Sequence, residues 1–246
     1  MFLPNTLFQF LPRNLSILFP DSYLDLINHP MKTNISGAIN RVFDEERKKV
    51  FLKLAKLNAG VLAGGTALAL QLTHRLSFDF DIFSPHRLPT RLLKNTEQIF
   101  GSQILRPVTN TPEFVDVILA PDIHLHFVHF PYPHLHPIIT TKGMPLFNIH
   151  DLASNKAYSM GHRPAWRDYV DIFFILKKGI RLETIIQEAK KRFEGKFDEK
   201  LFLEQLVYIK DIQDFSTSYI SKSYTPEEIK KFFEKETEKY LTQKIS

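Results

Sequence analysis

The stretch LAGGTALALQLTHRLSFDFDIFS, residues 62–84, decides the fold of this chain. It opens with a Gly-Gly-Thr turn at 64–66 and closes on two carboxylates, Asp79 and Asp81, with one residue between them. Good helix formers fill positions 67–72 and predict a buried helix directly after the turn. The segment is therefore expected to run from a tight turn through a helix into a strand.

The two carboxylates lie on the expected strand, where polar and apolar residues alternate. Alternation puts Asp79 and Asp81 on one face and Phe78, Phe80 and Ile82 on the other, which should pack on the core. Two carboxylates side by side repel each other unless a cation lies between them, and oxygen-only ligands suit Mg²⁺ or Mn²⁺. The sequence predicts that Asp79 and Asp81 bind such an ion; the alternative is a surface strand with two acidic residues.

The glycine turn supplies the second half of the expected site. Gly64 and Gly65 allow the backbone to approach a phosphate closely, and Thr66 adds a hydroxyl. Free N–H groups at the start of the following helix favour an anion. Alone, this pattern is typical of a plain strand-to-helix turn. Beside a metal-binding carboxylate pair, it predicts nucleotidyl transfer with an NTP as the substrate.

Three blocks of sequence, in order, resemble the signature of the AbiEii/AbiGii toxin family of nucleotidyltransferases, part of the DNA polymerase β-like superfamily. The first is 62–84, the second is FVHFPYP at 127–133, and the third is KAYSMGHRPAWRDYVDIFFIL at 156–176. The resemblance implies an α/β (α+β) fold, with a polymerase β-like mixed sheet and helices followed by a helical C-terminal domain. It also implies a metal-dependent enzyme with Mg²⁺ or Mn²⁺ on Asp79 and Asp81.

The third block carries the residues to which the resemblance assigns nucleotide contacts. Lys156 is implied as the lysine that binds the triphosphate, and a flexible ammonium suits that role. Arg163 and Arg167 are candidates for contact with the phosphates, and Asp168 for a catalytic role that positions Lys156 or the nucleobase. Without the family context, Lys156 would be read as an exposed helical lysine.

Asp171 and the pair His74-Arg75 are interpreted as structural residues. Asp171 follows Asp168 by three positions, so the two share a helix face, and most of its neighbours are apolar. Asp171 is expected to clamp the helical region to the catalytic sheet. His74-Arg75 is expected to be a structural link near the site rather than part of the catalytic machinery.

One position departs from the family pattern. The resemblance places a third carboxylate just before the Phe-Val of the second block, where this chain has His126. Three interpretations are open: His126 replaces the acid as a ligand or weak base, the third acid comes from elsewhere with Asp116 as the nearest candidate, or the protein binds nucleotide and transfers it poorly. His124 and His126 share one strand face, so a zinc site there is a further alternative.

Composition narrows the class of protein. The chain has 246 residues, 43% of them hydrophobic, and a net charge of +5, a mild basic excess that is compatible with an RNA partner. It has no cysteine, which excludes disulfides and cysteine zinc sites and suits a reducing cytoplasm, the predicted location. No apolar run reaches the roughly 20 residues of a membrane span, so no membrane partner is expected.

Three segments are expected along the chain. Residues 1–30, apolar but interrupted by prolines and unlike a signal peptide, are interpreted as an N-terminal accessory segment. Residues 31–148 form the expected nucleotidyltransferase domain and 149–246 the helical C-terminal domain. The expected helices lie at 31–59, 88–100 and 151–160, with a last helix opened by Pro226 and capped by Thr225, and the expected strands lie at 77–83, 103–108, 114–119 and 123–130.

The predicted reaction is transfer of a nucleoside monophosphate from an NTP to an acceptor hydroxyl. Family members are toxins of toxin–antitoxin systems and some modify the 3′ end of tRNA, so the resemblance makes tRNA the leading acceptor and implies a separately encoded antitoxin protein. Two alternatives remain open: transfer to a hydroxyl on a protein or small molecule, and a non-catalytic module that binds nucleotide or RNA. The histidine at position 126 favours the second alternative.

Overall fold

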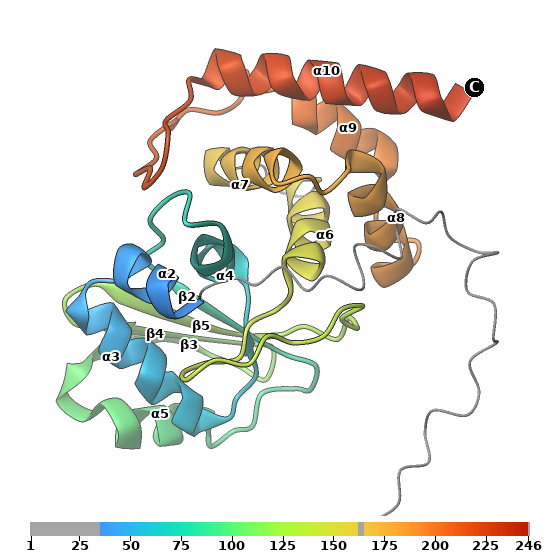
Figure 1. Ribbon diagram of the computed structural model, residues 1–246. Helices are drawn as coiled ribbons and strands as arrows, with labels where there is room; N and C mark the ends of the chain where they lie inside the picture. Colours follow the sequence, from blue (N-terminus) through green and yellow to red (C-terminus); the bar gives the residue numbers. More distant parts are fainter. Residues whose placement is uncertain (1–34, 162–164, 246) are drawn as a thin grey trace, which may run out of the picture. The chain divides into compact units, whose positions relative to one another are not determined.

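A five-stranded sheet and the helices around it form the described part of the chain (Figure 1). The computed structural model describes residues 35–161 and 165–245, so the accessory segment predicted at 1–30 lies outside the described residues. The strands are β1 (Val61–Leu62), β2 (Phe80–Ser84), β3 (Ile104–Asn110), β4 (Phe114–Leu119) and β5 (Ile123–His129). The helices are α2 (Ile35–Val42), α3 (Glu45–Leu54), α4 (Gly64–Leu72), α5 (Leu92–Phe100), α6 (Ile149–Met160), α7 (Trp166–Lys177), α8 (Leu182–Arg192), α9 (Glu199–Val207) and α10 (Pro226–Ile245), with 3₁₀ turns η2 (Ala55–Leu57) and η3 (Gly101–Gln103).

The sheet is mixed, with its strands in the order β1-β2-β5-β4-β3. β2 runs parallel to β5, and the other neighbouring pairs are antiparallel. The register places Asp81 opposite His126, and His126 opposite Asp116. Because directly opposite residues share a face of the sheet, these three polar side chains form one row across three neighbouring strands.

β2 begins at Phe80, later than the sequence predicts. Phe80 and Ile82 are fully buried, as the alternation requires. The prediction that Phe78 packs on the core is wrong, because this side chain is 41% exposed. Phe78 precedes the strand, and the guanidinium carbon of Arg47 lies 5.1 Å from the centroid of its ring. A cation over the ring face is a favourable contact at such an exposed site.

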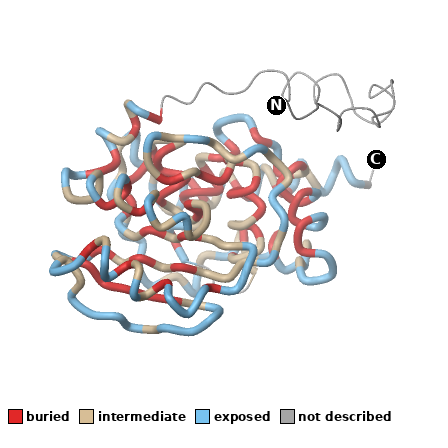
Figure 2. The backbone as a smooth tube through the Cα atoms, turned by 90° about the horizontal axis from the view of Figure 1, so that it is seen from below, coloured by how far each residue is buried: buried red, intermediate tan, exposed pale blue. Residues whose placement is uncertain are grey.

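Helix α4 joins the sheet to the helices that follow it. Its residues from Thr66 to Leu70 are all buried, because α4 contacts β2 as well as α6 and α7. Figure 1 shows α6 to α10 gathered on one side of the sheet. Buried residues in the interior of Figure 2 belong to one hydrophobic cluster that draws on strands and helices alike. The glycine turn at the start of α4 is therefore held between the sheet and the helical region.

Most elements have bounds close to those expected. The strand predicted at 114–119 has these bounds, and α10 starts at Pro226 as predicted. Thr225 caps α10, since its hydroxyl accepts from the N–H of Glu228 at 3.2 Å and its own N–H donates to the Glu228 carboxylate at 2.8 Å. The mixed sheet with its helices confirms the α/β (α+β) class. The boundary between residues 148 and 149 stays a prediction, because residues from Ile35 onward form one compact unit.

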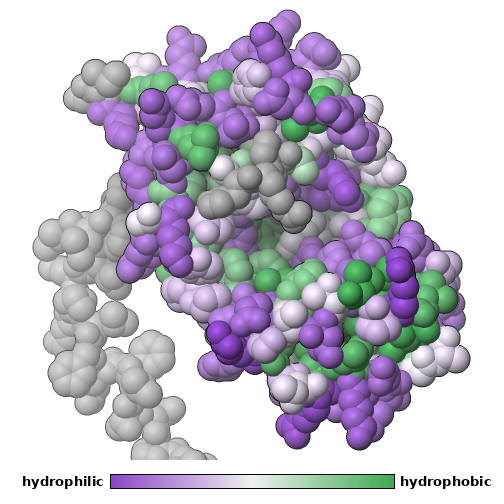
Figure 3. Space-filling model, turned by 180° about the vertical axis from the view of Figure 1, so that it is seen from behind, coloured by the Kyte–Doolittle hydropathy of each residue, from purple (hydrophilic) through white to green (hydrophobic). Residues whose placement is uncertain are grey.

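The surface is mostly hydrophilic on the face drawn in Figure 3, and this face is hollowed near its centre. The longest described helix, α10, has 20 residues and carries charged side chains along its length. Among the described residues, no helix combines the length and the apolar character needed to cross a membrane.

Candidate active site

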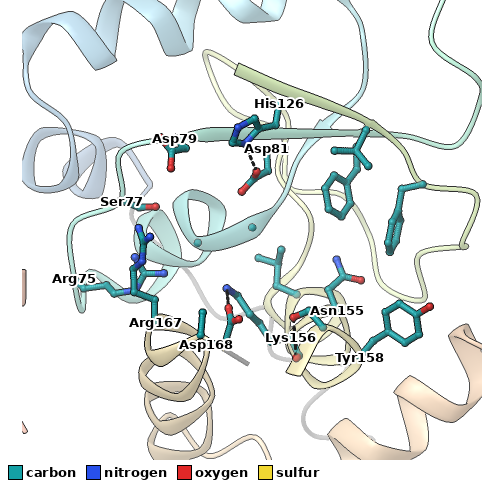
Figure 4. A pocket seen from close by; sticks show the side chains of 18 of the residues that line it. Arg75, Ser77, Asp79, Asp81, His126, Asn155, Lys156, Tyr158, Arg167 and Asp168 are labelled. Atoms are coloured by element: carbon teal, nitrogen blue, oxygen red, sulfur yellow. Dashed lines mark hydrogen bonds and ion pairs between the residues drawn. The ribbon is translucent and has the colours of Figure 1, made fainter. Parts of the chain in front are cut away.

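One cavity of about 880 Å³ brings most of the predicted site residues together (Figure 4). Its volume falls in the range of roughly 300–1,000 Å³ that small-molecule sites occupy. The sheet side contributes Asp79, Asp81 and His126, and the facing helices α6 and α7 contribute Lys156 and Asp168. The other predicted site residues on its wall are Gly64, Gly65 and Arg167.

The glycine turn lies directly against Asp81. Gly64 has a φ of +60°, and a Cβ at this position would lie 2.0 Å from Oδ2 of Asp81. A Cβ at Gly65 would lie 2.5 Å from Nη2 of Arg75. The N-cap residue of α4 is Ala63, which makes no capping hydrogen bond with its side chain, so the first N–H groups of α4 can face an anion at the cavity wall. The two glycines thus let the turn pack against a carboxylate and a guanidinium at once.

The hydroxyl of Thr66 is turned away from the cavity. Thr66 is fully buried, its hydroxyl donates to the backbone carbonyl of Asp79, and its Oγ1 lies 2.9 Å from Oγ of Ser77. The structure therefore does not bring this hydroxyl to the phosphate position for which the sequence predicted it. Its contacts instead fix the backbone that carries Asp79 just before β2 begins.

Asp79 and Asp81 point toward the cavity from the same side of the sheet (Figure 4). The backbone carbonyl of Asp81 accepts from the N–H of Ala63 at 2.8 Å, which ties the strand to the glycine turn. Oδ1 of Asp81 lies 3.0 Å from Nδ1 of His126. Among residues 35–161 and 165–245, none forms a hydrogen bond or ion pair with the carboxylate of Asp79. Two carboxylates, one of them unpaired in the described chain, fit a hard divalent cation.

His126 lies between carboxylates of the two neighbouring strands. Its Nδ1 faces Asp81, and its Nε2 lies 3.7 Å from Oδ1 of Asp116. The hydrogen bond to Asp81 raises the pKa of His126 above its ordinary value. Asp116 is buried and also lies 3.3 Å from Nδ1 of His124, and these three residues offer ligand atoms within 4.8 Å of one another. The structure thus places Asp116, the alternative third acid, next to His126, while His126 itself lines the cavity.

Asp171 is the centre of a buried ion cluster. Its carboxylate accepts from Arg75 at 2.7 and 2.8 Å, and it lies 2.8 Å from Nε2 of His74 and 2.8 Å from Nζ of Lys156. Burial alone would raise the pKa of Asp171, but the charges of Arg75 and Lys156 hold it well below its usual range. The cluster joins the segment after α4 to α6 and α7, the position in which a clamp is expected.

Lys156 contacts Asp171 on one side and Asp168 on the other. Burial opposes the charge of the ammonium, but Asp168 and Asp171 outweigh it and raise the pKa of Lys156 to about 12. The ammonium therefore keeps its charge at neutral pH, and it lines the cavity together with Asp168 and Arg167. Arg163, the other predicted phosphate contact, lies outside the described residues.

Another part of the cavity wall is aromatic, and no sequence pattern assigned it a role. Phe83, Phe130 and Tyr158 line this part, with the ring centroids of Phe83 and Phe130 4.5 Å apart. Asn155 lies beside them on α6 (Figure 4). Both polar atoms of its amide are buried, and no residue in the described part of the chain forms a hydrogen bond with them. An unsatisfied buried amide costs about 1–3 kcal/mol. Its position directly before Lys156 is the one sequence signal that could have drawn attention to Asn155.

The cavity combines two chemically different surfaces. One part offers carboxylates for a cation, and a helix N-terminus with basic side chains for an anion. The other part offers aromatic faces and the amide of Asn155, which is unpaired within residues 35–161 and 165–245. A ligand with a polyanionic end and a flat polar ring fits both parts.

Known proteins resemble this chain in sequence and in structure. A family model described as nucleotidyl transferase AbiEii toxin, type IV toxin–antitoxin system, matches residues 52–244. An uncharacterized protein of Aquifex aeolicus is 27% identical over 207 residues, which cover 82% of this chain and 98% of that protein. Among solved structures, JHP933 from Helicobacter pylori is 18% identical, with 85% of this chain and 98% of that chain covered and a TM-score of 0.43. MenT4, a nucleotidyltransferase toxin from Mycobacterium tuberculosis, is 12% identical, with 83% and 88% covered and a TM-score of 0.49.

Proposed function

Because the chain belongs to the AbiEii family of nucleotidyl transferase toxins, we propose that its cavity transfers a nucleoside monophosphate from an NTP to an acceptor hydroxyl. The observation that carries the proposal is the meeting of the glycine turn, Asp79, Asp81 and Lys156 on the wall of one cavity. The acceptor oxygen bonds to the α-phosphorus, the bond from that phosphorus to the bridging oxygen of the β-phosphate breaks, and pyrophosphate leaves. The hydroxyl proton is released. The family match confirms the resemblance and the enzyme class predicted from the sequence.

The two chemical parts of the cavity orient the NTP. We place the triphosphate along the N-terminus of α4, within reach of Lys156 and Arg167, where backbone N–H groups and two permanent cations offset its charge. Asp168 contacts the ammonium of Lys156 and so holds it at the cavity wall. The nucleobase then extends toward Phe130 and Asn155. Catalysis in this arrangement rests on positioning and charge neutralisation.

The carboxylates of Asp79 and Asp81 fit Mg²⁺ or Mn²⁺ by their donor chemistry. A divalent ion held there supplies charge neutralisation at the phosphates and activation of the acceptor oxygen. The chain's own contribution is to position the ligands. His126 bonds one oxygen of Asp81, the missing Cβ of Gly64 leaves room for the other oxygen, and Thr66 holds the backbone carbonyl of Asp79. Restrained ligands bind a metal without reorganising first.

An RNA, with the 3′ end of tRNA first, is the acceptor that we propose. The support is the family assignment together with the net charge of +5, which favours a polyanionic partner. Since the family model describes a toxin of a toxin–antitoxin system, we also propose a separately encoded antitoxin protein as a partner. The cytoplasm, where both tRNA and NTP are found, is the location that goes with this proposal.

Label transfer tests the proposed reaction directly. The full chain is incubated with each α-labelled NTP in turn, with Mg²⁺ or Mn²⁺ and with total RNA. We expect label in a tRNA-sized band with at least one NTP, and no label with the Asp79→Ala/Asp81→Ala double variant. The band identifies the acceptor class, and the NTP that works identifies the base.

The other outcomes of this assay separate the alternatives. Label on a protein band, or in a small-molecule fraction when a cell extract replaces RNA, would keep nucleotidyl transfer and reject the RNA acceptor. Absence of label in every fraction would reject the enzyme proposal and favour a module that only binds nucleotide or RNA. His126, at the register position opposite Asp81, is the observation that favours this second candidate function.

Replacing Asn155 by leucine should reduce base selectivity while transfer itself persists. The amide has both a donor and an acceptor buried in the aromatic part of the cavity, and neither has a hydrogen-bond partner among the described residues. A bound nucleobase is the group expected to satisfy them. Each such bond discriminates by about 1–3 kcal/mol, so we expect the ratio of kcat/KM between the best and the worst NTP to fall about 10-fold or more.

Ser159→Ala is the matched control for this variant, because Ser159 lines the same cavity from the same helix and keeps its hydroxyl on the carbonyl of Lys156. It should leave base selectivity unchanged. Equal loss of kcat/KM for all four NTPs in Asn155→Leu, with the ratio between them preserved, would show that Asn155 packs the wall without reading the base.

A further inference from the structure

Three potential metal ligands converge at a place away from the catalytic cavity. His136 lies in the segment after β5, His150 lies near the start of α6, and Glu188 lies on α8. Nε2 of His136 is 2.8 Å from Oε1 of Glu188, and Nδ1 of His150 is 3.7 Å from the same oxygen. The two imidazole rings are stacked with their centroids 4.6 Å apart. None of these residues lines the catalytic cavity.

The group is not fully satisfied by the protein atoms around it. Glu188 is 6% exposed, so its carboxylate needs a positively charged partner. His136 is one polar neighbour of this carboxylate, with its Nε2 2.8 Å from Oε1 of Glu188. Among the described residues, none forms a hydrogen bond with the buried Nδ1 of His150. One buried imidazole nitrogen therefore faces the Glu188 oxygen at 3.7 Å, beyond hydrogen-bonding distance.

The surrounding side chains hold His136 in place independently of any ion. The fully buried carboxylate of Asp151 accepts from the N–H of Leu135 at 2.7 Å and from the N–H of His136 at 3.0 Å. Nε of Arg192 donates to the carbonyl of Pro133 at 2.8 Å. The segment that carries His136 is thus fixed onto α6 and α8 by a second layer of hydrogen bonds, as is usual around metal ligands.

We infer that His136, His150 and Glu188 form a binding site for a divalent transition-metal ion, Zn²⁺ in the first place. Two imidazole nitrogens with one carboxylate oxygen are a donor set that zinc accepts readily, and the hard cations prefer oxygen alone. All three ligand atoms lie within 4.8 Å of one another. A single ion between them neutralises the buried carboxylate and gives the unpaired nitrogen of His150 a partner. One coordination position remains for water.

The expected role of this ion is structural. His136 precedes α6 in the chain, whereas Glu188 lies on α8, so the ion cross-links the segment between β5 and α6 to the helical region. That segment follows Phe130, which lines the aromatic part of the catalytic cavity. Binding to the folded chain alone raises the unfolding temperature, because a ligand that binds only the native state stabilises it by mass action.

The test measures zinc itself rather than enzyme activity. The full chain, without an affinity histidine tag, carries Asp81→Ala and His124→Ala so that an ion in the catalytic cavity does not count. Equilibrium dialysis against buffered Zn²⁺ should give about one ion per chain. His136→Ala, His150→Ala and Glu188→Gln should each weaken the affinity by about 100-fold or more, and His86→Ala, which removes an exposed imidazole elsewhere, should leave it unchanged.

Two further readouts keep the inference falsifiable if a histidine variant does not fold. Co²⁺ in place of Zn²⁺ should give visible d–d absorption in the parent chain, and Glu188→Gln, which preserves the size of the side chain, should abolish it. Zn²⁺ should also raise the melting temperature of the parent chain but not that of Glu188→Gln. Stoichiometric zinc with the same affinity in Glu188→Gln, or no zinc bound by the parent chain, would overturn the inference and leave a plain His136–Glu188 ion pair.

Discussion

Replacing Asp81 by asparagine should lower kcat for nucleotidyl transfer by about a thousandfold or more. The carboxylate faces the cavity between the glycine turn and His126, the position proposed above for a cation beside the triphosphate. Asparagine keeps the shape of the side chain but removes its charge, and its amide puts a donor where only acceptors serve. Single-turnover label transfer at saturating NTP and metal measures the effect on the chemical step.

Asp122→Asn is the matched control, because Asp122 is an exposed acid, 85% accessible, on the turn between β4 and β5. It should leave kcat within a factor of about two. His126→Asp in the same assay tests whether His126 supports catalysis or weakens it. A lower rate means that the imidazole has a role in orienting Asp81, and a large gain means that the natural site is crippled. If Asp81→Asn itself kept more than a tenth of the wild-type rate, this carboxylate would not be a ligand of the reacting complex.

The part of the site that the sequence predicts is the part built from neighbouring residues. The glycine turn and the two aspartates lie within one short stretch, and their spacing alone brings the turn against the strand. The structure adds the reason for the glycine: a Cβ at Gly64 would lie 2.0 Å from Oδ2 of Asp81. Strand alternation likewise located the buried face of Phe80 and Ile82 correctly. It failed at Phe78, because the alternation continues in sequence beyond the point where the strand begins.

The parts that the sequence could not predict depend on contacts between distant segments. Thr66 carries the hydroxyl expected at the phosphates, but a backbone carbonyl beside it in space competes for that hydroxyl and turns it inward. The aromatic wall combines β2, the segment after β5, and α6, and no local period links Phe83 to Phe130 or to Asn155. The same limit applies to His136 and Glu188, which are 52 residues apart and form their contact only through the packing of α8 on α6.

Replacing Asp171 by asparagine should destabilise the folded chain by about 3–5 kcal/mol, one of the largest losses of stability that a single substitution can cause here. The carboxylate is fully buried and is the shared partner of Arg75, His74 and Lys156. Asparagine leaves two buried cations without a counter-charge and points an amide donor at other donors. Chemical denaturation followed by circular dichroism measures the loss, and the melting temperature should fall by about 10 °C.

Asp168→Asn is the comparison that separates a clamp from a catalytic residue. Asp168 is 16% exposed in its side chain and contacts the same lysine from the cavity, so its removal should reduce transfer more than stability.

The pH dependence of the free energy of unfolding gives a second test of the role of Asp171. Because the pKa of Asp171 is held well below its usual range in the folded chain, its contribution to stability is present above the unfolded pKa of about 3.9 and is lost as the pH falls below it. The stability gap between wild type and Asp171→Asn should therefore be constant near neutral pH and close below about pH 4. A gap that stayed constant into the acid range would mean that packing of the side chain, rather than its charge, holds α7 to the segment after α4.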